Sequence, residues 1–203
     1  MTKSIVILFI TLLAVSCQNK KADQAAAMPA VETPVAPVAS TSSVATAKID
    51  ESLFTTPLGQ RLKADFNPTP GSQGSIDQNI IVEYVLKNNL DVKRTASGLY
   101  YMMEKEGKGN TAKASDIVTI NYKGYLLDGT EFDNSYKKGQ PLTYGVSDFV
   151  PGWTEALQLM KPGSKIKLIV PSALGYGQMG TPGGPIGPNA VLAFDMDLLS
   201  IGK

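Results

Sequence analysis

The 203-residue sequence contains no histidine and a single cysteine, Cys17. One cysteine cannot form a disulfide within the chain, and the missing histidines exclude the usual zinc sites and the nucleophilic pairs in which histidine is the base. Nineteen basic and 18 acidic side chains give a formal net charge of +1, so no excess of charge indicates nucleic acid as a partner. Shape, apolar surface, carboxylates and tyrosines must therefore carry any chemistry, and we expect neither a metal nor a cofactor.

The N-terminus has the layout of an export signal. A basic start is followed by an apolar run over residues 5–15, which is too short for an ordinary transmembrane helix. The run ends in LAVSC, which resembles the lipobox of bacterial lipoproteins, although Ala14 stands where that pattern has Leu, Val or Ile. We therefore expect residues 1–17 to be a signal peptide ending at a lipidated Cys17, which would anchor the chain in the bacterial cell envelope, facing the periplasm or in the outer membrane. An ordinary cleaved signal with an incidental cysteine is the alternative.

Residues 18–74 are expected to form a largely disordered tether. Up to residue 48 the chain is rich in Ala, Pro, Val, Ser and Thr and nearly lacks large apolar residues, so it cannot bury a core. Further on, SLFTTPLGQRL is compatible with a short helix, whereas NPTPGSQGS interrupts any regular element.

Residues 75–96 are expected to form a helical lead-in to the last part of the chain. Ser75 and Gln78 fit a capping box at the start of this helix. One face of the helix combines Ile80, Ile81, Tyr84, Val85 and the polar Asn88. Such a face would pack on the main domain or on a second copy of the chain.

Residues 97–203 have the pattern of a globular α+β domain. Alternating strands are predicted in IVTINYKGYLL, SKIKLIVP and AVLAFDMDLLSI, and Asp128-Gly129 is a strong hairpin signal. The segment WTEALQLM is the one clear helix, with Trp153 at the start of an apolar face. Because the apolar face of a sheet must be covered, we expect an antiparallel sheet wrapped around this short helix, with Trp153 in its concavity. The helical spacing alone is more typical of plain core.

Three motifs occur in order in this domain: VTINYKGYLLDGTEFDNS, VPGWTEALQLMKPGSKIKLIVPSALGYG and IGPNAVLAFDMDLL. Together they resemble the FKBP-type peptidyl-prolyl cis/trans isomerases over residues 97–203. The resemblance implies an antiparallel sheet on one helix, which agrees with the strand pattern. It also implies proline-containing polypeptides as substrates and macrolides as inhibitors.

The resemblance assigns site residues as well. Trp153 matches the indole on the pocket floor, Asp133 the pocket carboxylate, and Tyr176 the hydroxyl that reaches a ligand carbonyl; these three are the expected catalytic residues. The expected substrate-binding residues match the pocket walls, the backbone N–H donor with its neighbour, and the lip of the last loop: Tyr122, Phe132, Leu142, Phe149, Val150, Ile186 and Phe194. Two departures from the family are Leu142, where an aromatic is common, and the glycine-rich loop GQMGTPGGPIGPN, which is one residue longer than in compact members.

The implied reaction suits a chain of this composition. Rotation about an X-Pro bond makes and breaks no bond to a heavy atom, so no nucleophile, metal or cofactor is needed. We expect an isomerase that assists the folding of exported proteins at the cell envelope. A proline-binding chaperone or adaptor lipoprotein with little catalysis would use the same pocket, and an inert envelope lipoprotein would leave the pocket residues unexplained. Taken singly, each pocket residue is also compatible with an ordinary core or turn position.

Overall fold

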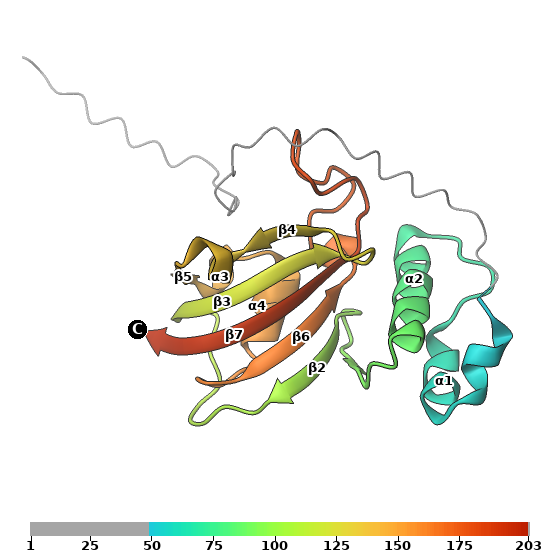
Figure 1. Ribbon diagram of the computed structural model, residues 1–203, viewed down its shortest axis with the longest axis horizontal. Helices are drawn as coiled ribbons and strands as arrows, with labels where there is room; N and C mark the ends of the chain where they lie inside the picture. The colour runs from blue at the N-terminus through green and yellow to red at the C-terminus, as the bar shows by residue number, and fades with distance from the viewer. Residues whose placement is uncertain (1–48, 203) are drawn as a thin grey trace, which may run out of the picture.

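The computed structural model describes residues 49–202, in which a group of helices precedes an antiparallel sheet (Figure 1). Cys17 and the predicted tether up to residue 48 lie outside the described residues. Among residues 49–202, no helix is long and apolar enough to cross a membrane.

The sheet has seven strands, all paired antiparallel in the order β1-β2-β6-β7-β3-β4, with β5 added to β3. Their bounds are β1 (Lys93–Arg94), β2 (Tyr100–Lys105), β3 (Ile117–Leu126), β4 (Glu131–Asn134), β5 (Leu142–Gly145), β6 (Lys165–Val170) and β7 (Leu192–Gly202). The predicted hairpin at Asp128-Gly129 is confirmed: it joins β3 to β4, and Gly129 takes the left-handed φ of 91° that such a turn requires.

The short helix α4 (Pro151–Leu157) covers the concave face of this sheet, as predicted (Figure 1). The strand faces expected to be apolar are buried, and α4 adds Trp153 and Ala156 to the same core. In the alternation of β3, Tyr125 lies on the face opposite to Ile120 and Tyr122, yet it too is only 9% exposed. The ammonium groups of Lys123 and Lys167 lie over its ring and cover it.

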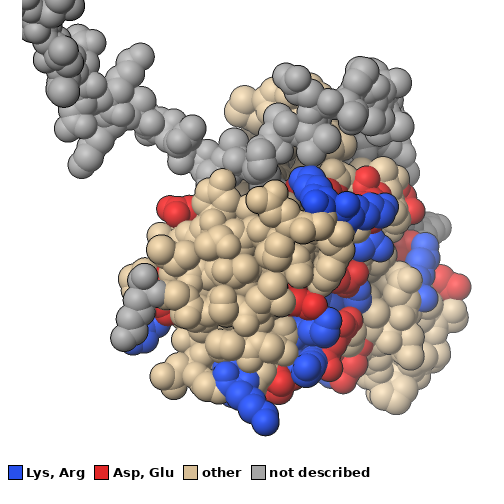
Figure 2. Space-filling view, turned by 60° about the vertical axis from the view of Figure 1, so that its left-hand side comes forward, with Lys and Arg blue, Asp and Glu red and all other residues tan. Residues whose placement is uncertain are grey.

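Charged side chains on the other face of the sheet pair across neighbouring strands. Lys165 of β6 faces Asp197 of β7 at 2.5 Å, and Lys167 pairs with Asp195 one step further along. Opposite charges directly across two strands stabilise their register. Figure 2 shows acidic and basic side chains mixed within one band of the face it presents, with no broad patch of a single sign there.

The folded part of the chain begins at an earlier residue than the sequence patterns indicated. The 3-10 helix η1 (Glu51–Thr55), α1 (Pro57–Leu62) and η2 (Lys63–Asp65) lie within the segment predicted to be tether. Of these, only the short helix in SLFTTPLGQRL had a sequence signal. Ile49, Phe54 and Leu62 are buried in a second core, so the folded part begins by residue 49 rather than at residue 75.

The lead-in helix α2 (Gln73–Lys87) begins two residues before the predicted start. Its N-cap is Ser72, whose hydroxyl accepts the N–H of Ser75, so the predicted capping box is displaced by three residues. The buried face also differs from the prediction, because Ile80 is 37% exposed. The apolar residues turned inward are Ile81, Val82, Val85 and Leu86. They pack with Tyr100 and Ile169 at the end of the sheet where β2 begins and β6 ends (Figure 1).

Candidate functional site

The start of α4 places the indole of Trp153. Val150 caps the helix, and its carbonyl accepts the N–H groups of Trp153 at 2.9 Å and Thr154 at 3.0 Å. Pro151 occupies the first helical position, where its fixed φ suits the helix and its missing N–H costs no hydrogen bond. The hydroxyl of Thr154 donates to the carbonyl of Val146 at 2.9 Å, which fixes the preceding segment against the helix. The position of Trp153 is therefore set by the backbone on both sides of it.

Five aromatic side chains meet around this indole, and we call them the aromatic cluster: Tyr122, Phe132, Phe149, Trp153 and Phe194. The ring of Trp153 meets Tyr122 edge-on with centroids 4.9 Å apart, and Phe194 edge-on at 5.0 Å. Phe149 lies 5.3 Å from the indole, and Phe132 packs on Phe194 at 5.7 Å. These spacings and tilts are those that aromatic rings prefer. The indole N–H is buried and has no acceptor among the described residues, so ring packing rather than a polar partner holds Trp153 there.

A glycine in β3 allows two of these rings to meet. A Cβ at Gly124 would lie 2.6 Å from the ring of Phe132 and 2.8 Å from that of Phe194. Any larger residue would push the two rings apart. The alternation in IVTINYKGYLL places Gly124 on the same face as Ile120 and Tyr122, but the sequence patterns gave it no role in the site. A glycine inside a strand is the signal that would have pointed to such a close approach.

Asp133 of β4 is joined to the aromatic cluster by a short hydrogen bond. The hydroxyl of Tyr122 donates to one carboxylate oxygen of Asp133 at 2.6 Å, while the N–H of Asn134 donates to the other at 2.7 Å. Burial, together with this bond to Asp133, raises the pKa of the Tyr122 hydroxyl above its ordinary value. Tyr122 therefore stays protonated and oriented by Asp133.

Lys138 completes the surroundings of Asp133. Its ammonium group lies 2.5 Å from Asp133, whose side chain is only 9% exposed. Lys138 ends α3 (Ser135–Lys138), a single turn capped by the side chain of Asn134. The sequence patterns did not point to Lys138. The asparagine cap in DNSYKK was the available signal, because it predicts a turn that brings the next lysines back toward Asp133.

Tyr176 lies in the loop between β6 and β7, two residues after the end of the 3-10 helix η4 (Ser172–Leu174). Its side chain is half-buried and packs against the main core. Burial, followed by the negative charge of Asp133, raises the pKa of its hydroxyl, which places the two groups within electrostatic reach of one another. Further along the same loop, the carbonyl of Ile186 accepts the N–H of Thr181 at 2.9 Å. Ile186 is 4% exposed and belongs to the same core.

The structure thus brings together the site residues expected in the sheet domain. Leu142, Phe149 and Val150 are partly buried against the core that contains Trp153, and Leu142 pairs with Ile120 across β5 and β3. The resulting site is apolar and aromatic, and its polar groups include the carboxylate of Asp133 and the hydroxyls of Tyr122 and Tyr176. Among residues 49–202, no group of His, Cys, Asp and Glu side chains is arranged to hold a metal.

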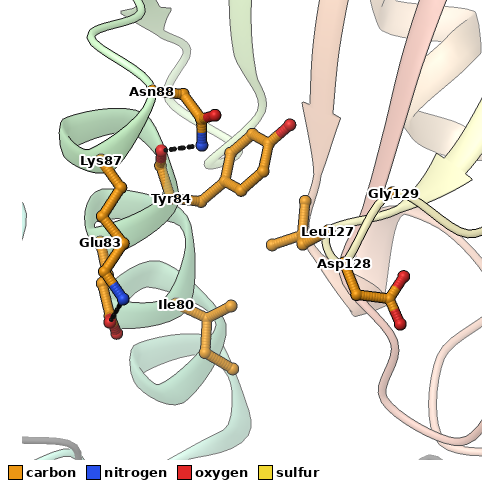
Figure 3. A pocket seen from close by; sticks show the side chains of 8 residues that line it. All are labelled: Ile80, Glu83, Tyr84, Lys87, Asn88, Leu127, Asp128 and Gly129. Atoms are coloured by element: carbon orange, nitrogen blue, oxygen red, sulfur yellow. Dashed lines mark hydrogen bonds and ion pairs between the residues drawn. The ribbon is translucent and has the colours of Figure 1, made fainter.

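A separate groove of about 470 Å³ lies between α2 and the turn that joins β3 to β4 (Figure 3). It is lined by Ile80, Glu83, Tyr84, Lys87, Asn88, Leu127, Asp128 and Gly129. Figure 3 shows Tyr84 and Leu127 facing each other from the two sides, with an ion pair between Lys87 and Glu83 on α2. None of the site residues expected from the sequence lines this groove.

Comparison with known proteins identifies the family. Residues 108–199 match the family described as FKBP-type peptidyl-prolyl cis-trans isomerase. The crystal structure of AtFKBP13 superposes with a TM-score of 0.51 at 31% identity, and this chain covers 98% of it with 54% of its own length. The chain belongs to the FKBP-type family. This confirms the assignment made from the three sequence motifs, and the matched residues include every predicted site residue of the sheet domain.

Bacterial members of the FKBP-type family are similar over a longer stretch. FkpA of Escherichia coli K12 is 50% identical over 110 residues, which are 54% of this chain and 40% of FkpA. The crystal structure of FkpA from Escherichia coli has a TM-score of 0.57 at 41% identity, covering 70% of this chain and 63% of that one. This FKBP-type chain therefore spans less than half the length of the curated FkpA that it matches.

Proposed function

We propose that this chain catalyses the cis-trans isomerisation of peptide bonds before proline in exported polypeptides. The observation that carries the proposal is the aromatic cluster closed around Trp153, with the Tyr122–Asp133 pair and Tyr176 beside it, in an FKBP-type chain. The names of its relatives describe the same reaction. No cofactor is required, because the reaction only rotates an amide bond.

The aromatic cluster suits this rotation. The barrier of roughly 18–20 kcal/mol arises from amide resonance, which the twisted transition state has lost together with its charge separation. The twisted amide is less polar than the planar amide. Moving from water to a dry aromatic site therefore costs the twisted amide less than the planar one, which lowers the barrier. We propose that the proline ring rests on Trp153 between Tyr122 and Phe194, while the other half of the amide rotates. This is preferential binding of the transition state.

Two hydroxyl groups have different tasks in this proposal. Tyr176 donates to a substrate carbonyl, and its raised pKa keeps the hydroxyl protonated for that purpose. Tyr122 is committed to Asp133, so we assign the carboxylate the task of orienting the Tyr122 ring as a wall of the site. Lys138 compensates the charge of this nearly buried carboxylate. The experiment that tests the function is a proline-isomerisation assay with a peptide containing Ala-Pro or Leu-Pro.

A proline-binding chaperone with little catalysis is the second candidate. The groove of Figure 3 favours it, because the partly exposed Ile80 beside Tyr84 and Leu127 offers an unfolded client a second contact surface. The same assay separates the two functions. A chaperone would suppress the aggregation of a proline-containing client at full strength while the isomerisation rate stayed at the uncatalysed level.

We also propose that the chain acts at the bacterial cell envelope, held by lipid on Cys17. The support is the sequence alone: a short apolar run followed by LAVSC. Several acyl chains on one cysteine would anchor firmly, since each buried methylene adds roughly 0.8 kcal/mol. At about 3.1 Å per residue when extended, the residues up to 48 would let the folded part reach up to roughly 90 Å from the membrane.

A further inference from the structure

A buried carboxylate links the lead-in helix to the sheet domain. Asp77 on α2 is fully buried, with an exposed fraction of 0%. One of its oxygens accepts the side-chain N–H of Gln73 at 2.7 Å. The other accepts two hydrogen bonds from Ser172, the backbone N–H at 2.8 Å and the hydroxyl at 2.6 Å. A buried charge is costly unless its oxygens receive such bonds, so Asp77 holds Ser172 tightly.

Ser172 in turn holds the backbone on both sides of Tyr176. The carbonyl of Ser172 accepts the N–H of Gly175 at 3.0 Å and that of Gly177 at 2.8 Å. These two glycines directly precede and follow Tyr176. The carbonyl of Gly177 then accepts the N–H of Asn189 at 2.9 Å, which ties this turn to the far end of the loop.

The space beside Gly177 in this turn is open. That residue has a φ of +60°, in the left-handed region that favours glycine, and no atom lies within 4 Å of where its Cβ would be. The hydrogen bonds to Ser172 restrain the chain around Tyr176 together with the bond from Asn189 and with the N–H of Gly180, which donates to the carbonyl of Tyr176 at 3.2 Å. Ser172 itself is held in place by the carboxylate of Asp77, which lies 95 residues earlier in the sequence.

We propose that Asp77 is a positioning residue: through Ser172, it fixes the loop so that the hydroxyl of Tyr176 reaches the substrate. This inference rests on the proposed isomerase function. It gives one residue of α2 a role in the site, so that the helix is more than a spacer before the sheet domain. The exposed side of the same helix lines the groove of Figure 3.

A double-mutant cycle in the full chain tests this role. We expect Tyr176→Phe to lower kcat/KM by about 2- to 10-fold, the loss of one hydrogen bond. Asp77→Ala should lower kcat/KM by no more than this factor. In the Tyr176→Phe background, Asp77→Ala should then lower it further by less than about 1.5-fold, because the group it positions is already gone. Losses that multiply, a wild-type rate for Asp77→Ala, or a wild-type rate for Tyr176→Phe would each overturn the proposal.

Two further variants separate positioning from stability. Val82→Ala weakens the packing of α2 and leaves the hydrogen-bonding groups of Asp77 and Ser172 in place, so it should keep the wild-type kcat/KM at a temperature where it is folded. A loss for Val82→Ala as large as that for Asp77→Ala would contradict the proposal. Asp77→Asn keeps an amide oxygen that can accept from Ser172, so it should recover most of the rate. Should Asp77→Ala fail to fold, Ser172→Ala replaces it in the cycle. This variant removes the hydroxyl bond to Asp77 and keeps the backbone N–H bond, so we expect losses in the same direction and of smaller size.

Amide hydrogen exchange gives a readout that does not depend on activity. In Asp77→Ala we expect the N–H groups of Gly175 and Gly177 to exchange about tenfold faster or more, while amides of β3 and β7 keep their protection. If Ser172→Ala takes its place, the same amides should exchange faster by a smaller factor, because the backbone bond to Asp77 remains. Unchanged exchange at both glycines would overturn the positioning role. A wild-type chain that does not isomerise proline peptides would refute the proposed function alone and leave this exchange experiment standing.

Discussion

Replacing Trp153 tests whether the indole is both core and floor of the site. Its side chain is 1% exposed and touches three other rings at 4.9, 5.0 and 5.3 Å. Truncating such a residue to alanine removes the apolar burial and leaves a cavity, which costs about 3–5 kcal/mol. That loss is a large part of the roughly 5–15 kcal/mol by which a domain is stable. Trp153→Phe keeps one ring in the cluster and should cost about 1–2 kcal/mol.

Urea unfolding followed by circular dichroism measures these losses, because Trp153 is the only tryptophan and its fluorescence disappears with it. Isomerisation is then measured at a temperature where each variant is folded. Trp153→Phe should lower the rate, since the floor under the proline ring has changed. Leu157→Ala is the matched control: it is equally buried on the same helix but outside the aromatic cluster. We expect it to lose about 2–5 kcal/mol of stability and to keep its rate.

Two results would refute this reasoning. A loss of stability below about 1 kcal/mol for Trp153→Ala would show that the indole is not part of the core. Alternatively, Trp153→Phe could match the wild-type rate while Leu157→Ala reduced it. The helix would then affect catalysis only through stability, and Trp153 would be an ordinary core residue.

Three further predictions address the ligand, the hydroxyl and the anchor. A macrolide with a proline-like ring should quench or shift the fluorescence of Trp153. Compared with an aromatic residue at the same position, Leu142 should weaken the binding by about 1 kcal/mol, because aromatic contact area is lost. Saturating binding with no change in fluorescence would place the ligand elsewhere. Because the pKa of Tyr176 is raised, its ionisation lies above the ordinary value of about 10, so kcat/KM should not fall between pH 7 and pH 9. A descending limb in that range would show that the hydroxyl titrates early. Cys17→Ser should move the protein from the membrane to the soluble fraction or leave it unprocessed, and normal processing with full membrane retention would exclude the lipid anchor.

The sheet domain was predictable because its signals are local. Alternation along β3, β6 and β7 gave the buried face, the Asp128-Gly129 turn gave the hairpin, and the lone apolar helix had to cover the sheet. The residues of the aromatic site were predicted from the three motifs, which occur in the chain in the order typical of the FKBP-type family. Tyr122 and Asp133 lie on neighbouring strands of one hairpin, so their contact follows from the register.

The lead-in was less predictable because its structure depends on distant partners. The helices over residues 51–65 are too short to form from propensity alone and are stabilised by burial against α2 and the sheet. The face of α2 was misjudged for the same reason: Ile80 borders a groove, while the polar Asp77 turns inward to meet Ser172. No spacing rule relates two residues 95 positions apart.

The central claim is that the aromatic site around Trp153 isomerises X-Pro bonds by preferential binding of the twisted amide. The most direct test is the isomerisation rate of an Ala-Pro peptide with the wild-type chain, Tyr176→Phe and Asp133→Ala, each checked for folding by a urea melt. We predict catalysis by the wild type, a modest loss for Tyr176→Phe with stability nearly unchanged, and a larger loss of rate than of stability for Asp133→Ala. A wild-type rate equal to the uncatalysed rate, or wild-type rates for both variants, would contradict the account.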